Sequence, residues 1–143
     1  MALLSEQDEK LLTEHLAAID TPVTLLLFTQ TIGGSESGPV AKQVLDEIAR
    51  LHDQVSVVEK NFVLDVEDRE KYAVDKAPAI VVLRNGEDTR MRMYGAPSGY
   101  EFVPLVEAIL LAGTGKLDLE DETRALLAGV TEPMRLQVFT TPT

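Results

Sequence analysis

A short polar loop carries the side chains of this protein that are best suited to chemistry. The sequence Gly-Gly-Ser-Glu-Ser-Gly occupies residues 33–38, directly after a predicted strand. A serine hydroxyl at Ser35 or Ser37 acts as a nucleophile only when a positioned base removes its proton. The two histidines are His15, on the first predicted helix, and His52, at the far end of the predicted helix that follows the loop. A serine enzyme is therefore only a formal alternative.

Two other kinds of site are disfavoured by residue type. Gly33 and Gly38 have the spacing of a phosphate-binding loop, but Pro39 and Val40 stand where Lys and Ser or Thr would follow. Proline also lacks a backbone N–H with which to hold phosphate. The acidic side chains between residues 65 and 70 are interleaved with basic ones, which is typical of a solvated helix face. We expect no metal site and no cofactor.

The composition of the whole chain narrows the function further. Its 143 residues include 13 Lys and Arg, 24 Asp and Glu and no cysteine, and the net charge is −11. This charge would repel a nucleic-acid backbone or an anionic membrane surface, so we expect neither as a partner. Without cysteine the chain holds no disulfide and no thiolate metal site. The first twenty residues mix acids with periodic leucines, unlike a secretory signal, and this predicts a cytoplasmic protein.

Hydrophobic periodicity predicts an α/β domain that places the polar loop between a strand and a helix. The apolar run at residues 23–28 predicts a strand buried on both faces, and Asn85-Gly86 predicts a hairpin turn. The predicted helices cover residues 5–18, 39–52, 65–72, 102–113 and 118–128, and the predicted strands cover residues 23–28, 55–58, 79–83 and 89–94. After the first helix the order is β-α-β-α-β-β-α, which is that of a thioredoxin-like unit.

Three segments of the chain resemble a known family. They are Lys76-Ala77-Pro78-Ala79-Ile80, Arg84-Asn85-Gly86 and Tyr94-Gly95-Ala96-Pro97-Ser98-Gly99-Tyr100-Glu101-Phe102. They resemble the first of two thioredoxin units in the tandem-thioredoxin (glutaredoxin-like) protein disulfide oxidoreductases, and the N-terminal domain of the flavoprotein subunit of alkyl hydroperoxide reductase. The resemblance covers nearly the whole chain. It implies a thioredoxin-like fold with an extra N-terminal helix and a C-terminal helix plus strand.

The resemblance gives the polar loop a meaning that the residues alone do not. In redox-active thioredoxin units two cysteines stand at this loop, where the helix N-terminus lowers the pKa of the first thiol. Ser35 and Gly38 fall at those two positions if one residue is inserted ahead of them. Because serine cannot cycle between thiol and disulfide, we expect this unit to be redox-inactive.

The resemblance also implies a groove for a peptide. In thioredoxin-like folds the proline before the third strand is cis and faces the active-site loop, and the backbone beside it can hydrogen-bond an extended peptide. This implies a cis bond between Ala77 and Pro78 and a shallow groove lined by Thr31, Ile32, Ala77 and Pro78. The alternative is a trans proline that begins an edge strand.

The C-terminal residues resemble the start of a second unit. Residues 135–143 are similar to the strand that, in relatives, leads directly into a catalytic Cys-Pro-x-Cys. We therefore divide the chain into 1–132, a thioredoxin-like unit without Cys-x-x-Cys, and 133–143, the first strand of a missing second unit. The alternative is a naturally short protein whose last strand pairs with its own sheet. A strand without its sheet leaves N–H and C=O groups unpaired, so it would be disordered or self-associate.

Two functions follow from these expectations. The first is a redox-inactive scaffold or docking unit in a thiol–disulfide oxidoreductase that serves a protein-disulfide or peroxide-reducing system. Its partners would be the second thioredoxin-like unit of the same parent chain and a peroxidase or other thiol protein, reached by disulfide exchange. The alternative is a stand-alone peptide-binding module with no redox role.

Overall fold

Four strands form one mixed sheet in the computed structural model, which describes residues 1–141. The strands are β1 (Val23–Thr29), β2 (Val55–Asn61), β3 (Ala79–Arg84) and β4 (Glu87–Tyr94). Their order across the sheet is β2-β1-β3-β4. β1 runs parallel to β2 and antiparallel to β3, and β3 pairs with β4 as an antiparallel hairpin. This is the α/β arrangement that the sequence predicts.

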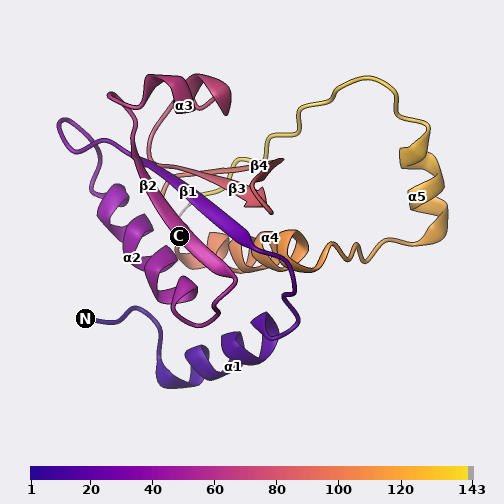
Figure 1. Ribbon diagram of the computed structural model, residues 1–143, viewed down its shortest axis with the longest axis horizontal. Coiled ribbons are helices and arrows are strands. Elements are labelled where there is room, and N and C mark those ends of the chain that lie inside the picture. The colour runs from indigo at the N-terminus through magenta and orange to yellow at the C-terminus, as the bar shows by residue number, and fades with distance from the viewer. Residues whose placement is uncertain (142–143) are drawn as a thin grey trace.

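The helices lie on both sides of the sheet (Figure 1). They are α1 (Glu6–Leu16), α2 (Ser37–Ala49), α3 (Val66–Lys71), α4 (Phe102–Thr114) and α5 (Asp121–Ala128), with a 3₁₀ turn, η1 (Gly99–Glu101), before α4. Figure 1 shows α1, α2 and α4 below the sheet and α3 above it, whereas α5 stands away from the rest of the fold. The sheet is therefore covered on both faces, but unequally.

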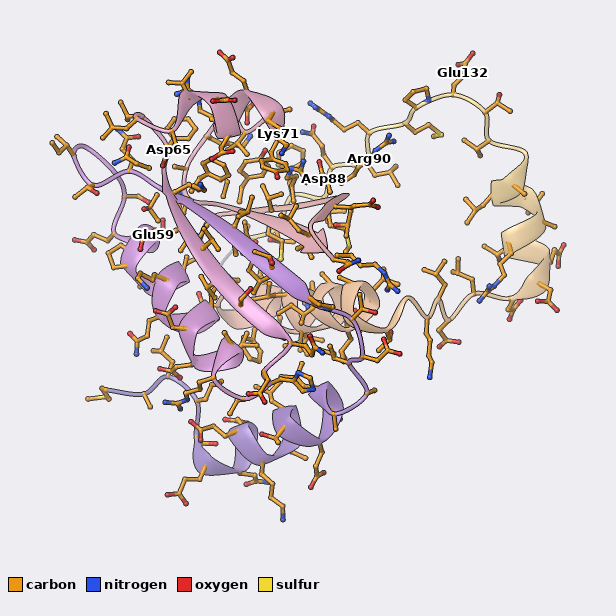
Figure 2. All side chains as sticks on the ribbon, viewed as in Figure 1. Glu59, Asp65, Lys71, Asp88, Arg90 and Glu132 are labelled. Atoms are coloured by element: carbon orange, nitrogen blue, oxygen red, sulfur yellow. The ribbon has the colours of Figure 1, made fainter. Side chains whose placement is uncertain are left out.

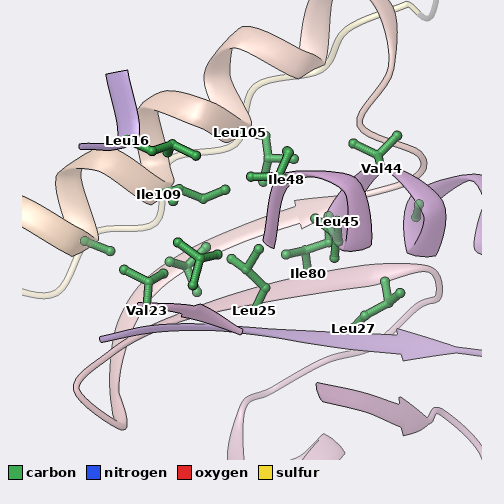
Figure 3. Close-up of a cluster of buried hydrophobic side chains, with 14 of the residues drawn as sticks. Leu16, Val23, Leu25, Leu27, Val44, Leu45, Ile48, Ile80, Leu105 and Ile109 are labelled. Atoms are coloured by element: carbon green, nitrogen blue, oxygen red, sulfur yellow. The ribbon is translucent and has the colours of Figure 1, made fainter. Parts of the chain in front are cut away.

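Strand β1 supplies side chains to two apolar clusters, one on each face of the sheet. Val23, Leu25 and Leu27 point into the larger cluster with side chains of α1, α2 and α4 (Figure 3). Leu26 and Phe28 point the other way, into a smaller cluster beneath the segment that contains α3. This confirms a strand buried on both faces, because alternate side chains of a strand point to opposite sides.

Local signals for turns and caps are mostly confirmed. Asn85 and Gly86 both have positive φ, 49° and 81°, as a tight hairpin turn requires. Ser5 caps α1 by accepting the backbone N–H of Asp8. α2 begins at Ser37, two residues earlier than predicted, and Pro39 stands in its first turn, where the missing N–H would have no partner in the helix. The prediction that α5 begins at 118 is wrong, since the helix begins at Asp121.

The C-terminal segment forms no strand with the sheet of this domain in residues 133–141, and residues 142 and 143 lie outside the described residues. That residues 133–143 begin a second unit stays a prediction, because the strand would then need a sheet outside this domain. The segment returns to the body of the fold, where Met134 and Leu136 line a shallow depression of about 430 Å³ beside β4 and α4. Thr140 also donates a hydrogen bond to the Glu101 carboxylate. An extended segment becomes a strand only when a neighbouring strand supplies its hydrogen-bond partners.

Candidate functional site

The polar loop and the predicted proline lie at the same edge of the sheet. The loop, residues 30–36, follows the last residue of β1, and Phe28 near that end pairs with Ala79 at the start of β3. Pro78 immediately precedes Ala79 in the chain. The turn after β2 leaves the sheet beside them, because the N–H of Phe62 donates to the carbonyl of Thr29 at 2.8 Å. The register of three neighbouring strands thus gathers three connecting segments at one edge.

Two glycines fix the course of the loop. Gly33 has a φ of +71°, a conformation that side chains rarely adopt. At Gly34 a Cβ atom would lie 1.9 Å from the carbonyl oxygen of Gln30, which no real contact permits. The side-chain amide of Gln30 in turn donates to the carbonyl of Ile32 at 2.9 Å. The loop therefore has a tight backbone that depends on glycine.

Ser35 and Gly38, the predicted redox positions, meet at the start of α2. The N–H of Gly38 donates to the carbonyl of Ser35 at 3.3 Å, so the two residues form one turn. The hydroxyl of Ser35 is exposed and hydrogen-bonds the hydroxyl of Ser37. Gly38 is buried, and a Cβ there would make only an ordinary contact of 3.8 Å with Thr29. At the two predicted redox positions the turn therefore holds one hydroxyl, that of Ser35, and no side chain at Gly38.

Neither histidine lies at this edge, where it could serve as the base for a serine nucleophile. His52 precedes β2 at the opposite end of the sheet, where Val55 pairs with Val23. A strand of seven residues puts roughly 20 Å between the two ends. His52 Nδ1 is also engaged, because it accepts the N–H of Gln54 at 3.1 Å. His15 lies in the last turn of α1, the helix that precedes β1. The formal alternative of a serine enzyme therefore receives no support.

The proline has the conformation that the resemblance implies. The peptide bond between Ala77 and Pro78 is cis. Pro78 is buried, and its carbonyl accepts the N–H of Gly95 at 2.9 Å. Within residues 1–141 the backbone N–H and C=O of Ala77 have no hydrogen-bond partner. A main-chain donor and acceptor thus remain available beside the proline.

The four residues predicted to line a groove are at this edge. Thr31 and Ile32 are exposed, Ala77 is half-buried and Pro78 is buried. Two depressions of the described surface lie elsewhere, one on α2 and one between β4 and α4. The groove beside Pro78 stays a prediction.

The nearby basic side chains are paired with acids or stacked on rings. The Lys76 ammonium lies 4.7 Å from the centre of the Tyr94 ring, and burial together with the charge of Asp75 raises the pKa of the Tyr94 hydroxyl. Lys60 pairs with Asp68 at 2.9 Å, and this hydrogen bond raises the pKa of the Lys60 ammonium. In the described part of the chain, no three His, Asp or Glu side chains gather as a metal site would require.

Sequence reasoning missed the turn that joins β2 to α3. The side-chain oxygen of Asn61 accepts the N–H groups of Val63 and Leu64 at 2.9 and 3.0 Å. The carboxylate of Asp65 accepts the N–H of Asn61 at 2.6 Å. The residue types indicate such a turn, because the side chains of Asn and Asp commonly hydrogen-bond backbone groups a few residues away.

The fold and this edge have counterparts in known proteins. No protein-family model matches the chain. The chain is 30% identical over 83 residues to the AhpF component of alkyl hydroperoxide reductase in Staphylococcus epidermidis. It superposes with a TM-score of 0.78 and 25% identity on the NTD_N/C domain of AhpF of Enterococcus faecalis, covering 85% of this chain. On a protein disulfide oxidoreductase of Aeropyrum pernix the TM-score is 0.76, at 23% identity and over 90% of this chain. The chain has a thioredoxin-like fold.

These similarities confirm both resemblances stated from the sequence. The thioredoxin-like chain is nevertheless much shorter than its relatives. It spans 14% of the Staphylococcus protein, 58% of the Enterococcus chain and 56% of the Aeropyrum chain. In the described residues, moreover, each helix is too short or too polar to cross a membrane.

Proposed function

We propose that this thioredoxin-like domain is a redox-inactive scaffold or docking unit of a thiol–disulfide oxidoreductase. The observation that carries the proposal is the turn that Ser35 and Gly38 form at the start of α2 in a chain without cysteine, and we assign these two residues to the redox positions. Gly33 and Gly34 fix the backbone of the loop that leads into this turn. Electron transfer by disulfide exchange needs a thiolate, which this turn cannot supply.

A second thioredoxin-like unit of the same parent chain is the proposed main partner. Helix α5 stands apart from the fold in Figure 1, and its apolar side chains Leu126 and Leu127 are exposed. The segment that follows exposes Leu136, Val138 and Phe139. Exposed apolar surface of this extent is typical of a face that another domain covers. On this proposal, residues 1–132 form one unit and residues 133–143 begin the next.

The proposed setting is a cytoplasmic system that reduces protein disulfides or peroxides, with a peroxidase or other thiol protein as a further partner. The similarity to the AhpF component of alkyl hydroperoxide reductase supports the class of system.

A stand-alone peptide-binding module is the second candidate function. The free N–H and C=O of Ala77, beside the exposed side chains of Thr31 and Ile32, favour it. An extended peptide could pair with this main chain as one strand pairs with another.

The inactivity is tested with a disulfide-reduction assay on insulin, with dithiothreitol as the electron source. The chain should reduce insulin no faster than the reagent alone. The Ser35→Cys/Gly38→Cys double variant should accelerate the reduction, because the turn would then hold a thiol pair at a helix N-terminus. The Ser35→Cys single variant is the matched control. Turnover by the unchanged chain would refute the proposal.

The scaffold role is tested by reading the gene beyond the codon for Thr143. A second thioredoxin-like unit that begins with a Cys-x-x-Cys motif is the expected result. A stop codon at that point would instead favour the stand-alone peptide-binding module. A flavin-binding region further along would place the unit in a peroxide-reducing flavoprotein.

A further inference from the structure

Three exposed aliphatic side chains lie on two neighbouring segments at the edge of the sheet that carries the polar loop. Ile32 is 88% exposed in the loop after β1, and Val63 and Leu64 are 52% and 77% exposed in the turn after β2. The two segments leave the sheet side by side, because Phe62 donates its N–H to Thr29. We call Ile32, Val63 and Leu64 the apolar corner. Sheet pairing places them at one edge, although they are about thirty residues apart in the chain.

Hydrogen bonds fix the backbone of the turn, so the side chains of Val63 and Leu64 are held in solvent. Asn61 accepts both of their N–H groups, and the carboxylate of Asp65 accepts the N–H of Asn61. From the next helix, Arg69 donates to the carbonyl of Phe62 at 2.9 Å and lies 5.1 Å from the centre of its ring. Each of these bonds restrains the residues flanking the aliphatic pair. The pair is thus presented at a fixed position, which lowers the entropy lost on binding.

The loop presents Ile32 in a comparable way. The amide of Gln30 holds the carbonyl of Ile32, and the next residue, Gly33, has the positive φ that turns the chain back. The side chain therefore extends from a tight turn with no packing of its own. The loop after β1 and the turn after β2 therefore each have a restrained backbone that holds aliphatic side chains at the same edge.

The surroundings of the apolar corner are acidic. Residues 29–38 and 59–78 contain seven acidic and four basic residues. The basic side chains are engaged: Lys60 pairs with Asp68, and the other three lie over the rings of Phe62, Tyr72 and Tyr94. In residues 1–141, by contrast, no ion pair forms at Glu36 in the loop or at Glu67 at the start of α3. Figure 2 shows Glu59 and Asp65 in the same part of the molecule as the loop.

We propose that the apolar corner docks a segment of a partner protein that has aliphatic side chains flanked by Lys or Arg. The proposal rests on the proposed docking function and names the chemistry of its partner. Aliphatic groups would cover Ile32, Val63 and Leu64, and the basic flanks would meet the unpaired carboxylates of Glu36 and Glu67. A second copy of this chain does not fit, because it carries the same net charge of −11.

The test uses three synthetic decapeptides with blocked ends. The first has a central Leu-Val-Leu flanked by lysines, the second replaces the lysines with glutamates, and the third replaces the central aliphatic residues with serines. Binding to the full 143-residue chain is followed by amide chemical shifts in two-dimensional NMR. The lysine-flanked aliphatic peptide should bind at least about tenfold more tightly than the other two. Its affinity should fall several-fold between about 50 and 500 mM NaCl.

Variants locate the binding surface. Val63→Ser/Leu64→Ser should weaken the first peptide about tenfold, and Glu36→Gln/Glu67→Gln should weaken it and flatten its salt dependence. The control is Val103→Ser, which changes a side chain 60% exposed on α4 and should leave affinity unchanged. The shifted amides should lie in residues 31–36 and 61–66.

Several outcomes would overturn the proposal. Equal affinity for all three peptides, or shifts confined to another face, would do so. Concentration-dependent shifts of these residues without peptide would show that a second copy covers the apolar corner. If the lysine-flanked aliphatic peptide does not bind and the unchanged chain still does not reduce insulin, only the proposed docking partner is refuted. Insulin turnover by the unchanged chain would instead remove the proposed redox-inactive function.

Discussion

A buried carboxylate on α2 gives a quantitative test of how the N-terminal residues are held. Glu47 is 6% exposed and is the one charged side chain of the described residues that is buried. Its two oxygens accept the N–H of Leu3 at 2.8 and 2.9 Å and the N–H of Leu4 at 2.9 Å. The amide of Gln43 adds a bond of 3.0 Å. The carboxylate thus ties the residues before α1 to α2.

The expected loss in Glu47→Gln follows from these bonds. The N–H of Leu3 is shared between the two oxygens, so the carboxylate holds two backbone donors, and at about 1.5–3 kcal/mol net each they contribute roughly 3–6 kcal/mol. Releasing three residues of backbone returns about 1 kcal/mol each in entropy. The free energy of unfolding should therefore fall by about 1–2 kcal/mol at pH 7. For a domain of this size the melting temperature should fall by roughly 3–6 °C.

The loss should depend on pH in one direction. Burial alone would raise the pKa of Glu47, but the donors Leu3, Gln43 and Leu4 and the charge of Arg50 outweigh it and hold the pKa below 4.5. A carboxyl whose pKa is lower in the folded state stabilises the fold above its unfolded pKa. That stabilisation disappears as the pH falls through the folded pKa. The two proteins should therefore converge in stability in the acid range below about pH 4.5.

The measurement is urea unfolding of both proteins at several pH values between 3 and 7. Glu107→Gln, on the exposed side of α4, is the matched control and should cost less than about 0.5 kcal/mol. Deleting residues 1–4 in both backgrounds completes a double-mutant cycle. Coupling near zero at pH 7, or a difference between the two proteins that does not change with pH, would refute the role assigned to Glu47.

Two further substitutions test the packing around α4. At Gly113, which is buried, an added Cβ would lie 2.7 Å from two side-chain atoms of Ile19, so Gly113→Ala should destabilise by about 1–3 kcal/mol in thermal unfolding. Gly129→Ala, whose nearest neighbour would be at 3.4 Å, is its control, and equal melting temperatures would contradict the close approach. The guanidinium of Arg84 donates to the carbonyl of Ala112 at 2.8 Å near the end of α4. Arg84→Met should cost about 1–2 kcal/mol in urea unfolding, and an unchanged midpoint would show that water replaces this bond.

Elements stabilised by their own residues were predictable from the sequence, and those that depend on other parts of the chain were less so. The apolar run of β1 and the Asn85-Gly86 turn carry local signals strong enough to fix their structure. The segment after α5 has the alternation of a strand, yet it forms none in residues 133–141. Strand formation requires a partner, which a pattern within one segment does not contain.

The candidate site was predicted in part for the same reason. The strand order and register place the loop near Pro78, and both follow from the predicted order of elements and the resemblance. The apolar corner was not predicted, because Val63 and Leu64 follow a strand and have the residue types of a buried core. Their exposure depends on the bonds from Asn61, which bend the chain away from the sheet.

Docking and redox chemistry have separate structural requirements at this edge of the sheet. Disulfide exchange needs sulfur atoms at Ser35 and Gly38, whereas docking needs only a fixed backbone and exposed groups around them. The bonds that fix the neighbouring turn come from Asn61, Asp65 and Arg69, and none of them involves the loop. Replacing a redox pair by Ser and Gly therefore removes the chemistry without removing the surface. It follows that Ser35→Cys/Gly38→Cys should change insulin reduction and leave peptide affinity unaltered, whereas Val63→Ser/Leu64→Ser should do the reverse.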